Sequence, residues 1–162
     1  MTPPGWLIDH DPDLDLILTR DMAVPRGILW MCWTTPEHLK PWFVPKPHRV
    51  TDCRIDLRVG GACETTFDVD GNIMENRGVY LEVVPEERLV FTDTYTEGWK
   101  PAPDPFMTAI LTFEDLGQGR TRYTAVVRHR SAEAARQHAD MGFHDGWGMV
   151  AAQLEDYARG LG

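Results

Sequence analysis

Few side chains in this sequence have both the type and the spacing that catalysis requires. His144 is the one histidine that suggests a mechanism, because it precedes Trp147 by three residues and would border the same helix face. Its imidazole could exchange a proton near neutral pH if a strand carboxylate approached it in an enclosed site. The simpler interpretation is a histidine at a helix kink that bonds solvent or backbone, because a lone histidine is a weak signal.

The other metal-binding and nucleophilic residue types match no familiar arrangement. His138 and His144 are six residues apart, whereas helical zinc ligands are offset by four, so the pair predicts no metal site. Cys32, Cys53 and Cys63 fit no metal or redox spacing and are typical of reduced, mostly buried thiols in a cytoplasmic protein. The sequence contains no nucleophile elbow, phosphate-binding loop or dinucleotide fingerprint. We therefore expect neither a metal ion nor a cofactor.

The acidic balance of the chain excludes several classes of partner. Its 162 residues carry a formal net charge of -9, with 25 acidic side chains against 16 basic ones. A surface of that sign repels phosphate backbones and anionic lipid, so we expect no nucleic acid and no membrane insertion. No apolar run approaches the ~20 residues of a membrane span, and the N-terminus lacks the features of a secretory signal. We expect a cytoplasmic protein with a flexible arm over residues 1–12 and a single domain over residues 13–162.

The N-terminal part of that domain predicts a strand and two short helices. Leucines alternate with other residues from Leu14 onward, which predicts a half-buried strand, and Pro25 opens an apolar helix. Thr34 could cap a second helix through a capping box with Glu37. Alternatively, Thr35 could cap a helix whose first position is Pro36. The position of the cap is therefore open by one residue.

A series of short strands follows, each bounded by turn residues. Asp70-Gly71 is a strong signal for a hairpin with a primed turn, and residues 98–105 are expected to form the longest irregular loop. The strands are expected near residues 50–56, 63–69, 73–83, 89–95, 107–113 and 123–127. The solvated face is the default for the charged strand residues Glu64, Glu75, Arg77, Asp93 and Glu114.

The last part of the chain predicts a helix that packs on the sheet. Ser131 is a good N-cap, a break is expected near residues 140–145, and Gly160 supplies the C-terminal stop. After the break, apolar residues recur at three- and four-residue spacing and define one helix face. These residues are Phe143, Trp147, Val150, Leu154 and Tyr157.

Four short motifs occur in a fixed order along the chain. They are Trp33-Thr34-x-Pro36-x-x-Leu39-x-x-Trp42-Phe43, Asp56-Leu57-Arg58-Val59-Gly60-Gly61, Asp70-Gly71, and Gly146-Trp147 followed by Leu154. Over residues 13–160 the chain resembles the START-like (SRPBCC) superfamily, and within it the stand-alone relatives of the C-terminal domain of the heat-shock-protein-90 ATPase activator. The resemblance implies an α+β helix-grip fold, in which a bent antiparallel sheet wraps around a long C-terminal helix and two short N-terminal helices close one end. It also implies a cavity between sheet and helix, which elsewhere in the superfamily holds lipids, hormones or polyketides.

The inward face of the gripped helix is the candidate ligand-binding site. The competing interpretation of its apolar residues is simple packing against the sheet. Trp99, in the Pro-rich loop, would be either a lid or a contact surface. The candidate ligand-binding residues are Trp147, Val150, Ala151, Leu154 and His144 on the helix, Phe43 near the cavity mouth, and Trp99.

Three functions are compatible with such a fold. The first is binding of an apolar or amphipathic small molecule in a hydrophobic cavity without catalysis, and this is the reading we favour. The second is an enzyme of cyclase, dehydratase or hydrolase type, which needs a titratable side chain that faces the cavity within hydrogen-bond reach of another. The third is a chaperone-associated interaction module, although the chain has no room for the separate N-terminal domain of the co-chaperone. A homodimer is compatible with all three.

Overall fold

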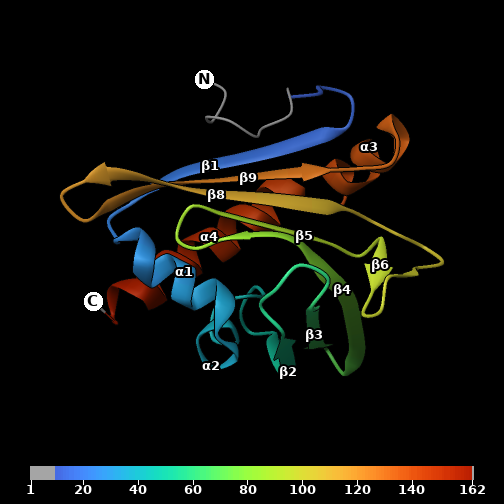
Figure 1. Ribbon diagram of the computed structural model, residues 1–162, viewed down its shortest axis with the longest axis horizontal. Helices are drawn as coiled ribbons and strands as arrows, with labels where there is room; N and C mark the ends of the chain where they lie inside the picture. The colour runs from blue at the N-terminus through green and yellow to red at the C-terminus, as the bar shows by residue number, and fades with distance from the viewer. Residues whose placement is uncertain (1–9, 162) are drawn as a thin grey trace.

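The protein is built on one curved antiparallel sheet, shown in Figure 1 as a computed structural model that describes residues 10–161. Most of the expected arm over residues 1–12 therefore lies outside the described residues. The sheet has seven strands in the order β1-β9-β8-β5-β4-β3-β2, and all neighbours are antiparallel. Its strands are β1 (Asp15–Met22), β2 (Arg49–Ile55), β3 (Ala62–Val69), β4 (Asn72–Val84), β5 (Arg88–Thr92), β8 (Thr108–Gly117) and β9 (Arg120–Arg128).

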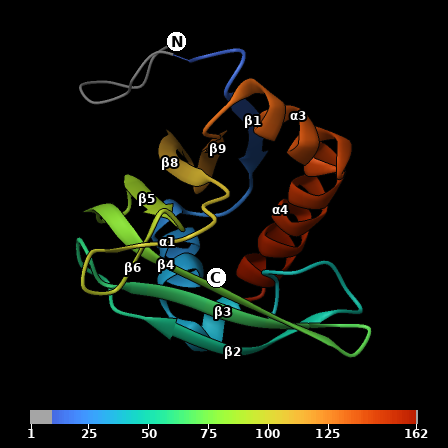
Figure 2. The same ribbon diagram turned by 90° about the vertical axis from the view of Figure 1, so that its right-hand side faces the viewer.

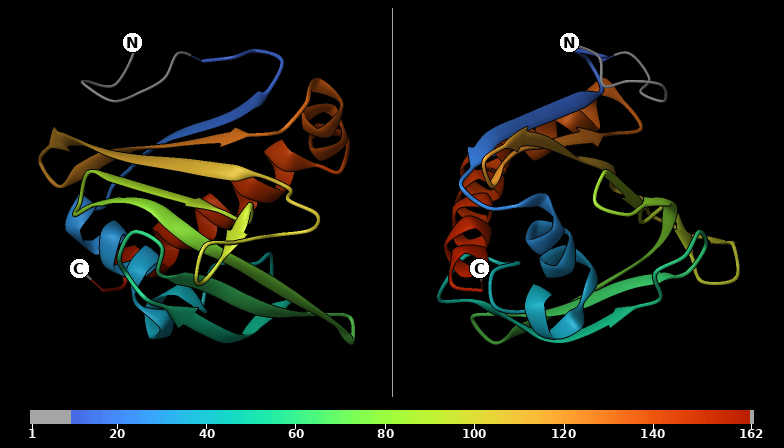
Figure 3. Two further views of the ribbon diagram at one scale, coloured as in Figure 1. Left: turned by 45° about the vertical axis from the view of Figure 1, so that its right-hand side comes forward. Right: turned by 60° about the vertical axis from the view of Figure 1, so that its left-hand side comes forward.

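Helices occupy the concave side of this sheet. They are α1 (Arg26–Thr34), α2 (Pro36–Leu39), α3 (Ala132–Asp140) and α4 (Phe143–Arg159). Figure 2 shows the sheet curling from β9 and β8 through β5 to β4, β3 and β2, with α4 across the open side of the curl. The right-hand view of Figure 3 shows α1 and α2 closing one end. The predicted α+β helix-grip fold is therefore confirmed.

The local signals explain most element boundaries. The Asp70-Gly71 hairpin has positive φ angles of 52° and 85°, as a primed two-residue turn requires. The second helix begins with Thr35 as its N-cap and Pro36 in the first turn. The capping box does not form, because the Thr34 hydroxyl donates to the Trp30 carbonyl at 2.7 Å. The open choice of cap is thus settled in favour of Thr35.

The strand expected over residues 89–95 is shorter than predicted, and the loop after it is more ordered. β5 ends at Thr92, and a two-stranded ribbon of β6 (Tyr95–Thr96) and β7 (Lys100–Pro101) lies where an irregular loop was expected. The left-handed conformations of Gly98 and Trp99 make the turn of this ribbon. The carboxylate of Asp93 then accepts hydrogen bonds from the backbone N–H groups of residues 106 and 107, which fixes the return of the chain to β8.

The break predicted in the C-terminal helix is confirmed at Gly142. This residue has a left-handed backbone conformation with φ of 99°, which interrupts the helix between α3 and α4. Ser131 caps α3 as expected, since its hydroxyl accepts a hydrogen bond from the Ala134 N–H at 3.1 Å. α4 ends before Gly160, but this glycine has a right-handed conformation with φ of -72°, so the stop does not depend on its backbone freedom.

α4 is fastened to the segment after α2 by one amide side chain. The Gln153 Nε2 atom donates to the carbonyls of Trp42 and Val44 at 2.9 and 2.8 Å, and its Oε1 atom accepts from the Lys46 N–H at 3.0 Å. Three backbone groups that lie outside helix and strand are satisfied in this way. The segment and α4 are therefore held as one unit.

Candidate functional site

A cavity of about 580 Å³ lies between the concave face of the sheet and α4. Most of its wall is apolar and comes from α1, the segment after α2, strands β2 to β5, and the region around the α3–α4 break. Its large apolar wall residues are Trp33, Leu39, Phe43, Val44, Ile55, Phe67, Met74, Tyr80, Phe91, Phe106, Met107, Tyr123, Met141, Trp147 and Val150.

Three of the predicted ligand-binding residues lie on this wall. Trp147 and Val150 approach the cavity from α4, and Phe43 approaches it from the segment after α2. Trp147 is half-buried, and its indole stacks on Phe143 with ring centroids 5.4 Å apart. Phe43 packs edge-on against Trp33 at 5.5 Å. Their contact with a ligand stays a prediction, and their positions on the wall are compatible with it.

The remaining predicted residues do not contribute to the wall. Ala151 and Leu154 are buried in the main core cluster, to which residues of α1 also belong. His144 is exposed, and its ring contacts the edge of Phe143 rather than the cavity. The helix face is therefore divided: one part seals the core, and the part nearer the α3–α4 break faces the cavity.

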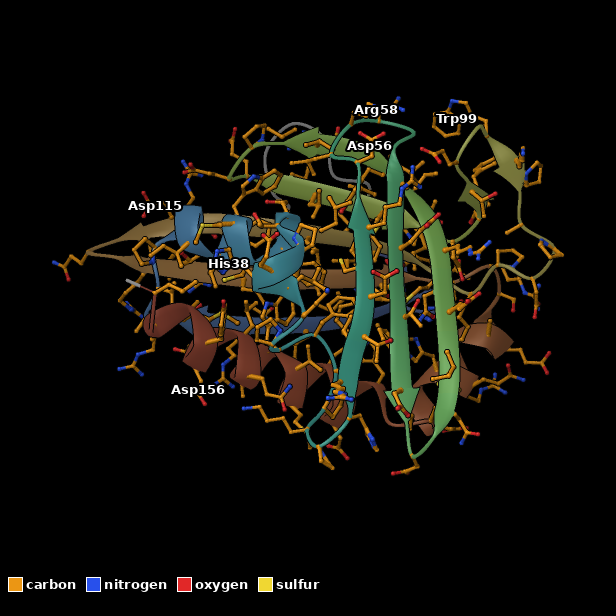
Figure 4. The ribbon with its side chains drawn as sticks, turned by 90° about the horizontal axis from the view of Figure 1, so that it is seen from below. His38, Asp56, Arg58, Trp99, Asp115 and Asp156 are labelled. Atoms are coloured by element: carbon orange, nitrogen blue, oxygen red, sulfur yellow. The ribbon has the colours of Figure 1, made fainter. Side chains whose placement is uncertain are left out.

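Trp99 lies outside the cavity on the turn of the β6–β7 ribbon. Figure 4 shows its indole at the same end of the sheet as Asp56 and Arg58. The ring covers Gly60, where a Cβ atom would come within 2.8 Å of it, and meets Tyr95 edge-on at 5.8 Å. With 51% of its surface exposed, Trp99 is a surface residue packed over a glycine, not a lid on the described cavity.

Glu64 and Arg77 keep the solvated default although they border the cavity, because they alternate with the inward-facing Cys63, Thr65, Asn76 and Gly78 and so point to the other face of the sheet. Asp93, which follows β5, also borders the cavity. Asp93 already accepts backbone hydrogen bonds from the loop before β8, and Arg77 pairs with Glu75 at 3.3 Å on an exposed part of β4. The polar residues on the inward face of the sheet are instead Thr65 and Asn76, which lie opposite each other on β3 and β4.

The two thiols on the wall are not activated nucleophiles. Burial raises the pKa of Cys53 to about 11 and that of Cys63 to about 12. Both side chains therefore stay protonated near neutral pH, when a reactive cysteine would be a thiolate. They act here as small apolar wall residues.

The most unusual polar feature of the wall is a pair of buried histidines that the sequence reasoning missed. His138 of α3 lies on the wall, and its Nδ1 atom is 2.9 Å from Nε2 of His129. The other nitrogen of His129, Nδ1, is 2.9 Å from the Leu14 carbonyl. His138 is 8% exposed and His129 is 3% exposed, so both rings are enclosed by protein.

A signal for this pair was present in the sequence. His129 follows β9 directly and continues the alternation of the buried Tyr123, Ala125 and Val127, which places it on the inward side. His138 follows Ala135 by three residues on the buried face of α3. The partner of His138 is thus not His144, six residues further on, but His129, directly after β9.

Neither membrane spanning nor a clustered metal site is indicated in the part of the chain that the structure describes. Its helices are too short or too polar to cross a bilayer. Over residues 10–161, no group of three or more histidine, cysteine, aspartate or glutamate side chains is placed to hold a metal ion.

The motifs, the gripped helix and the cavity agree with a comparison of the sequence with family models. The model described as "Activator of Hsp90 ATPase homolog 1-like protein" matches residues 23–159. The chain belongs to this family. The match includes all of α1 through α4, and with them every wall residue of the cavity.

Solved structures of bacterial proteins support the family assignment. A protein from Nitrosomonas europaea is 42% identical, with a TM-score of 0.89 and coverage of 93% of this chain and 97% of that one. A protein from Mycobacterium smegmatis is 29% identical, with a TM-score of 0.73 and coverage of 98% and 96%. A family member from Silicibacter pomeroyi, 19% identical with a TM-score of 0.66 over 88% and 95%, shares the fold. No curated protein matches the chain.

Proposed function

We propose that this member of the activator-like family binds an apolar or amphipathic small molecule in the cavity between its sheet and α4. The observation that carries the proposal is the cavity itself, whose volume of about 580 Å³ falls within the range of small-molecule sites. A core evolved for packing alone has few voids larger than a water molecule, so a space of this size needs another explanation.

The composition of the wall supports an apolar or amphipathic ligand. Aromatic and aliphatic side chains dominate it, with a few polar groups at its border and the His129–His138 pair beside it. Ligand sites commonly combine such a wall with a small number of fixed polar groups that set orientation. The free thiols Cys32, Cys53 and Cys63 support a reducing compartment, and we propose the cytoplasm.

Filling part of the cavity should weaken binding without unfolding the protein. Val150→Phe adds bulk to a wall residue next to existing empty space, so we expect at least about a tenfold loss of affinity for an apolar fluorescent probe. Met149→Phe is the matched control. Met149 is the neighbour of Val150 in the sequence, but its side chain is 50% exposed and is not part of the wall. Titration of the neutral probe N-phenyl-1-naphthylamine and thermal unfolding measure the two effects. Equal probe binding by both variants and the wild type would contradict the proposal.

Acid–base catalysis in the same cavity is a second candidate function. The observation that favours it is His138, a titratable wall residue within hydrogen-bond reach of another titratable side chain, which is the arrangement that catalysis requires. Burial, together with the neighbouring His129, lowers the pKa of His138 to about 4. The imidazole is therefore unprotonated, and able to accept a proton, throughout the neutral range.

Ester hydrolysis tests this second candidate through its pH dependence. If His138 acts as the base, hydrolysis of p-nitrophenyl butyrate should keep a constant rate from about pH 6 upward to the point where hydroxide dominates. An ordinary surface histidine would lose activity below about pH 7, because its pKa lies near 6.5. A rate that follows this ordinary titration, or that survives in His138→Asn, would assign the hydrolysis to another group.

A further inference from the structure

The hydrogen bonds of the His129–His138 pair determine which nitrogen atoms carry protons. A carbonyl oxygen can only accept, so Nδ1 of His129 must donate to the Leu14 carbonyl at 2.9 Å. In neutral His129 the other nitrogen, Nε2, is then an acceptor. Nδ1 of His138 must therefore donate to it across 2.9 Å. The chain of bonds runs in one direction, from His138 through His129 to the backbone of residue 14.

This direction leaves one lone pair at the end of the chain. With its proton on Nδ1, neutral His138 has an unprotonated Nε2 atom that can accept a hydrogen bond but cannot donate one. Nε2 has no hydrogen-bond partner among residues 10–161. Within the same residues, the one fully buried side-chain nitrogen or oxygen without a partner is the indole nitrogen of Trp33. Nε2 of His138 is unpaired but is not one of these fully buried atoms, so it keeps accessible surface that a small molecule can reach.

The ring of His138 packs against aromatic neighbours. Phe106 lies against it with ring centroids 4.6 Å apart, and Phe143 meets it edge-on at 5.2 Å. Phe106, Met107, Met141 and Trp147 share the cavity wall with His138, so the surroundings of the lone pair are largely apolar. A hydrogen bond made in such surroundings contributes more selectivity than the same bond in water, because an unmatched polar group is costly there.

We propose that Nε2 of His138 is the polar anchor of the cavity and that the natural ligand is an amphipathic molecule with a neutral hydroxyl group. The inference rests on the proposed binding function and specifies its ligand class. A hydroxyl donates to the lone pair, whereas an ether offers no donor, and a carboxylate would bring its own lone pairs and a charge against an acceptor. The cavity should thus prefer alcohols or phenols to the matching ethers and carboxylates.

Three probes with the same apolar chain test this preference: decanol, decyl methyl ether and decanoate. Isothermal titration of the wild-type protein near neutral pH should show decanol binding about tenfold more tightly than the ether, the effect expected of one hydrogen bond. Decanoate should bind more weakly than decanol. Equal affinity for decanol and the ether, or a preference for decanoate, would overturn the inference while leaving a binding cavity in place. Binding of none of the three would remove the proposed function as well.

Two amide variants separate the anchor from the structural role of the ring. The side chain of His138→Gln can place its carbonyl near the Nε2 position and keep an acceptor for the ligand there. The shorter side chain of His138→Asn can donate to His129 from the Nδ1 position but places no acceptor at the Nε2 position. We expect the preference for decanol over its ether to survive in His138→Gln and to disappear in His138→Asn. If both variants keep it, or if neither binds decanol while both remain folded by circular dichroism, His138 is not the anchor.

The tautomer itself gives a readout that does not depend on any ligand. Long-range proton–nitrogen correlation spectra of the free protein should show His138 protonated on Nδ1 and unprotonated on Nε2 near neutral pH. A proton on Nε2 would reverse the direction of the chain of bonds and contradict the inference directly. This measurement also covers the case in which both amide variants fail to fold.

Discussion

Replacement of Trp42 by alanine is expected to lower the free energy of unfolding by about 3–5 kcal/mol. Trp42 has no exposed surface, and its indole meets Trp33 edge-on with ring centroids 4.9 Å apart. Its Nε1 atom also donates to the His38 carbonyl at 2.8 Å, which ties the short α2 to the core. The substitution would remove a large buried ring and leave that carbonyl without its partner.

Urea denaturation measures this loss, with Trp30→Ala as the matched control. Trp30 lies on the neighbouring α1 but is only half-buried and makes one edge contact with Phe113 at 5.9 Å. Its replacement should cost clearly less, at an unchanged dependence on denaturant. A loss below about 1 kcal/mol for Trp42→Ala, the size of a surface effect, would show that the helices close the end of the sheet less tightly than described.

Gly61→Ala should have an effect of comparable size for a different reason. A Cβ atom at position 61 would lie 2.0 Å from the carbonyl oxygen of Asp56, which is backbone and cannot rotate away. The turn would have to open to relieve this contact. Opening it would disturb the hydrogen bond that the Gly61 carbonyl accepts from the N–H of the wall residue Tyr80 at 3.1 Å. We expect a loss of about 3 kcal/mol, the upper end of ordinary overpacking.

The control for this prediction is another glycine-to-alanine change where the structure has room. Gly148 lies in α4, and a Cβ atom there would meet nothing within 4 Å. Gly148→Ala should therefore stabilise the protein by about 0.5–1 kcal/mol, because alanine favours the helix. Thermal unfolding of both variants makes the comparison. A Gly61→Ala protein as stable as the wild type would mean that the turn has another accessible conformation.

These two sites also show why the sequence predicts the frame of this fold well. Gly61 is the last residue of the Asp56–Gly61 motif, and Trp42 belongs to the motif that begins at Trp33. Both requirements are local: one is a close backbone approach, and the other is a large ring next to a short helix. Local requirements leave spacing patterns in the sequence, so the elements and their order could be predicted from it.

The candidate site was harder to predict, because its composition depends on how distant elements meet. Helical periodicity places Trp147, Val150 and Leu154 on one face, yet Leu154 packs in the core while the other two reach the cavity. The His129–His138 bond joins a strand to a helix, and the relative placement of those two elements determines it. No spacing rule within one element contains that information.

The fastening of α4 by Gln153 has a consequence for how fast a ligand could exchange. One end of the cavity includes Phe43 and Val44, and the side chain of Gln153 holds that segment to α4 through three hydrogen bonds with its backbone. At the other end the wall includes Met141, which is 74% exposed, and the exposed ring of Phe106. Rotation of these two side chains requires no backbone hydrogen bond to break. The residence time of a bound molecule would then be governed by the rotamers of Met141 and Phe106, and its affinity by the enclosed wall behind them.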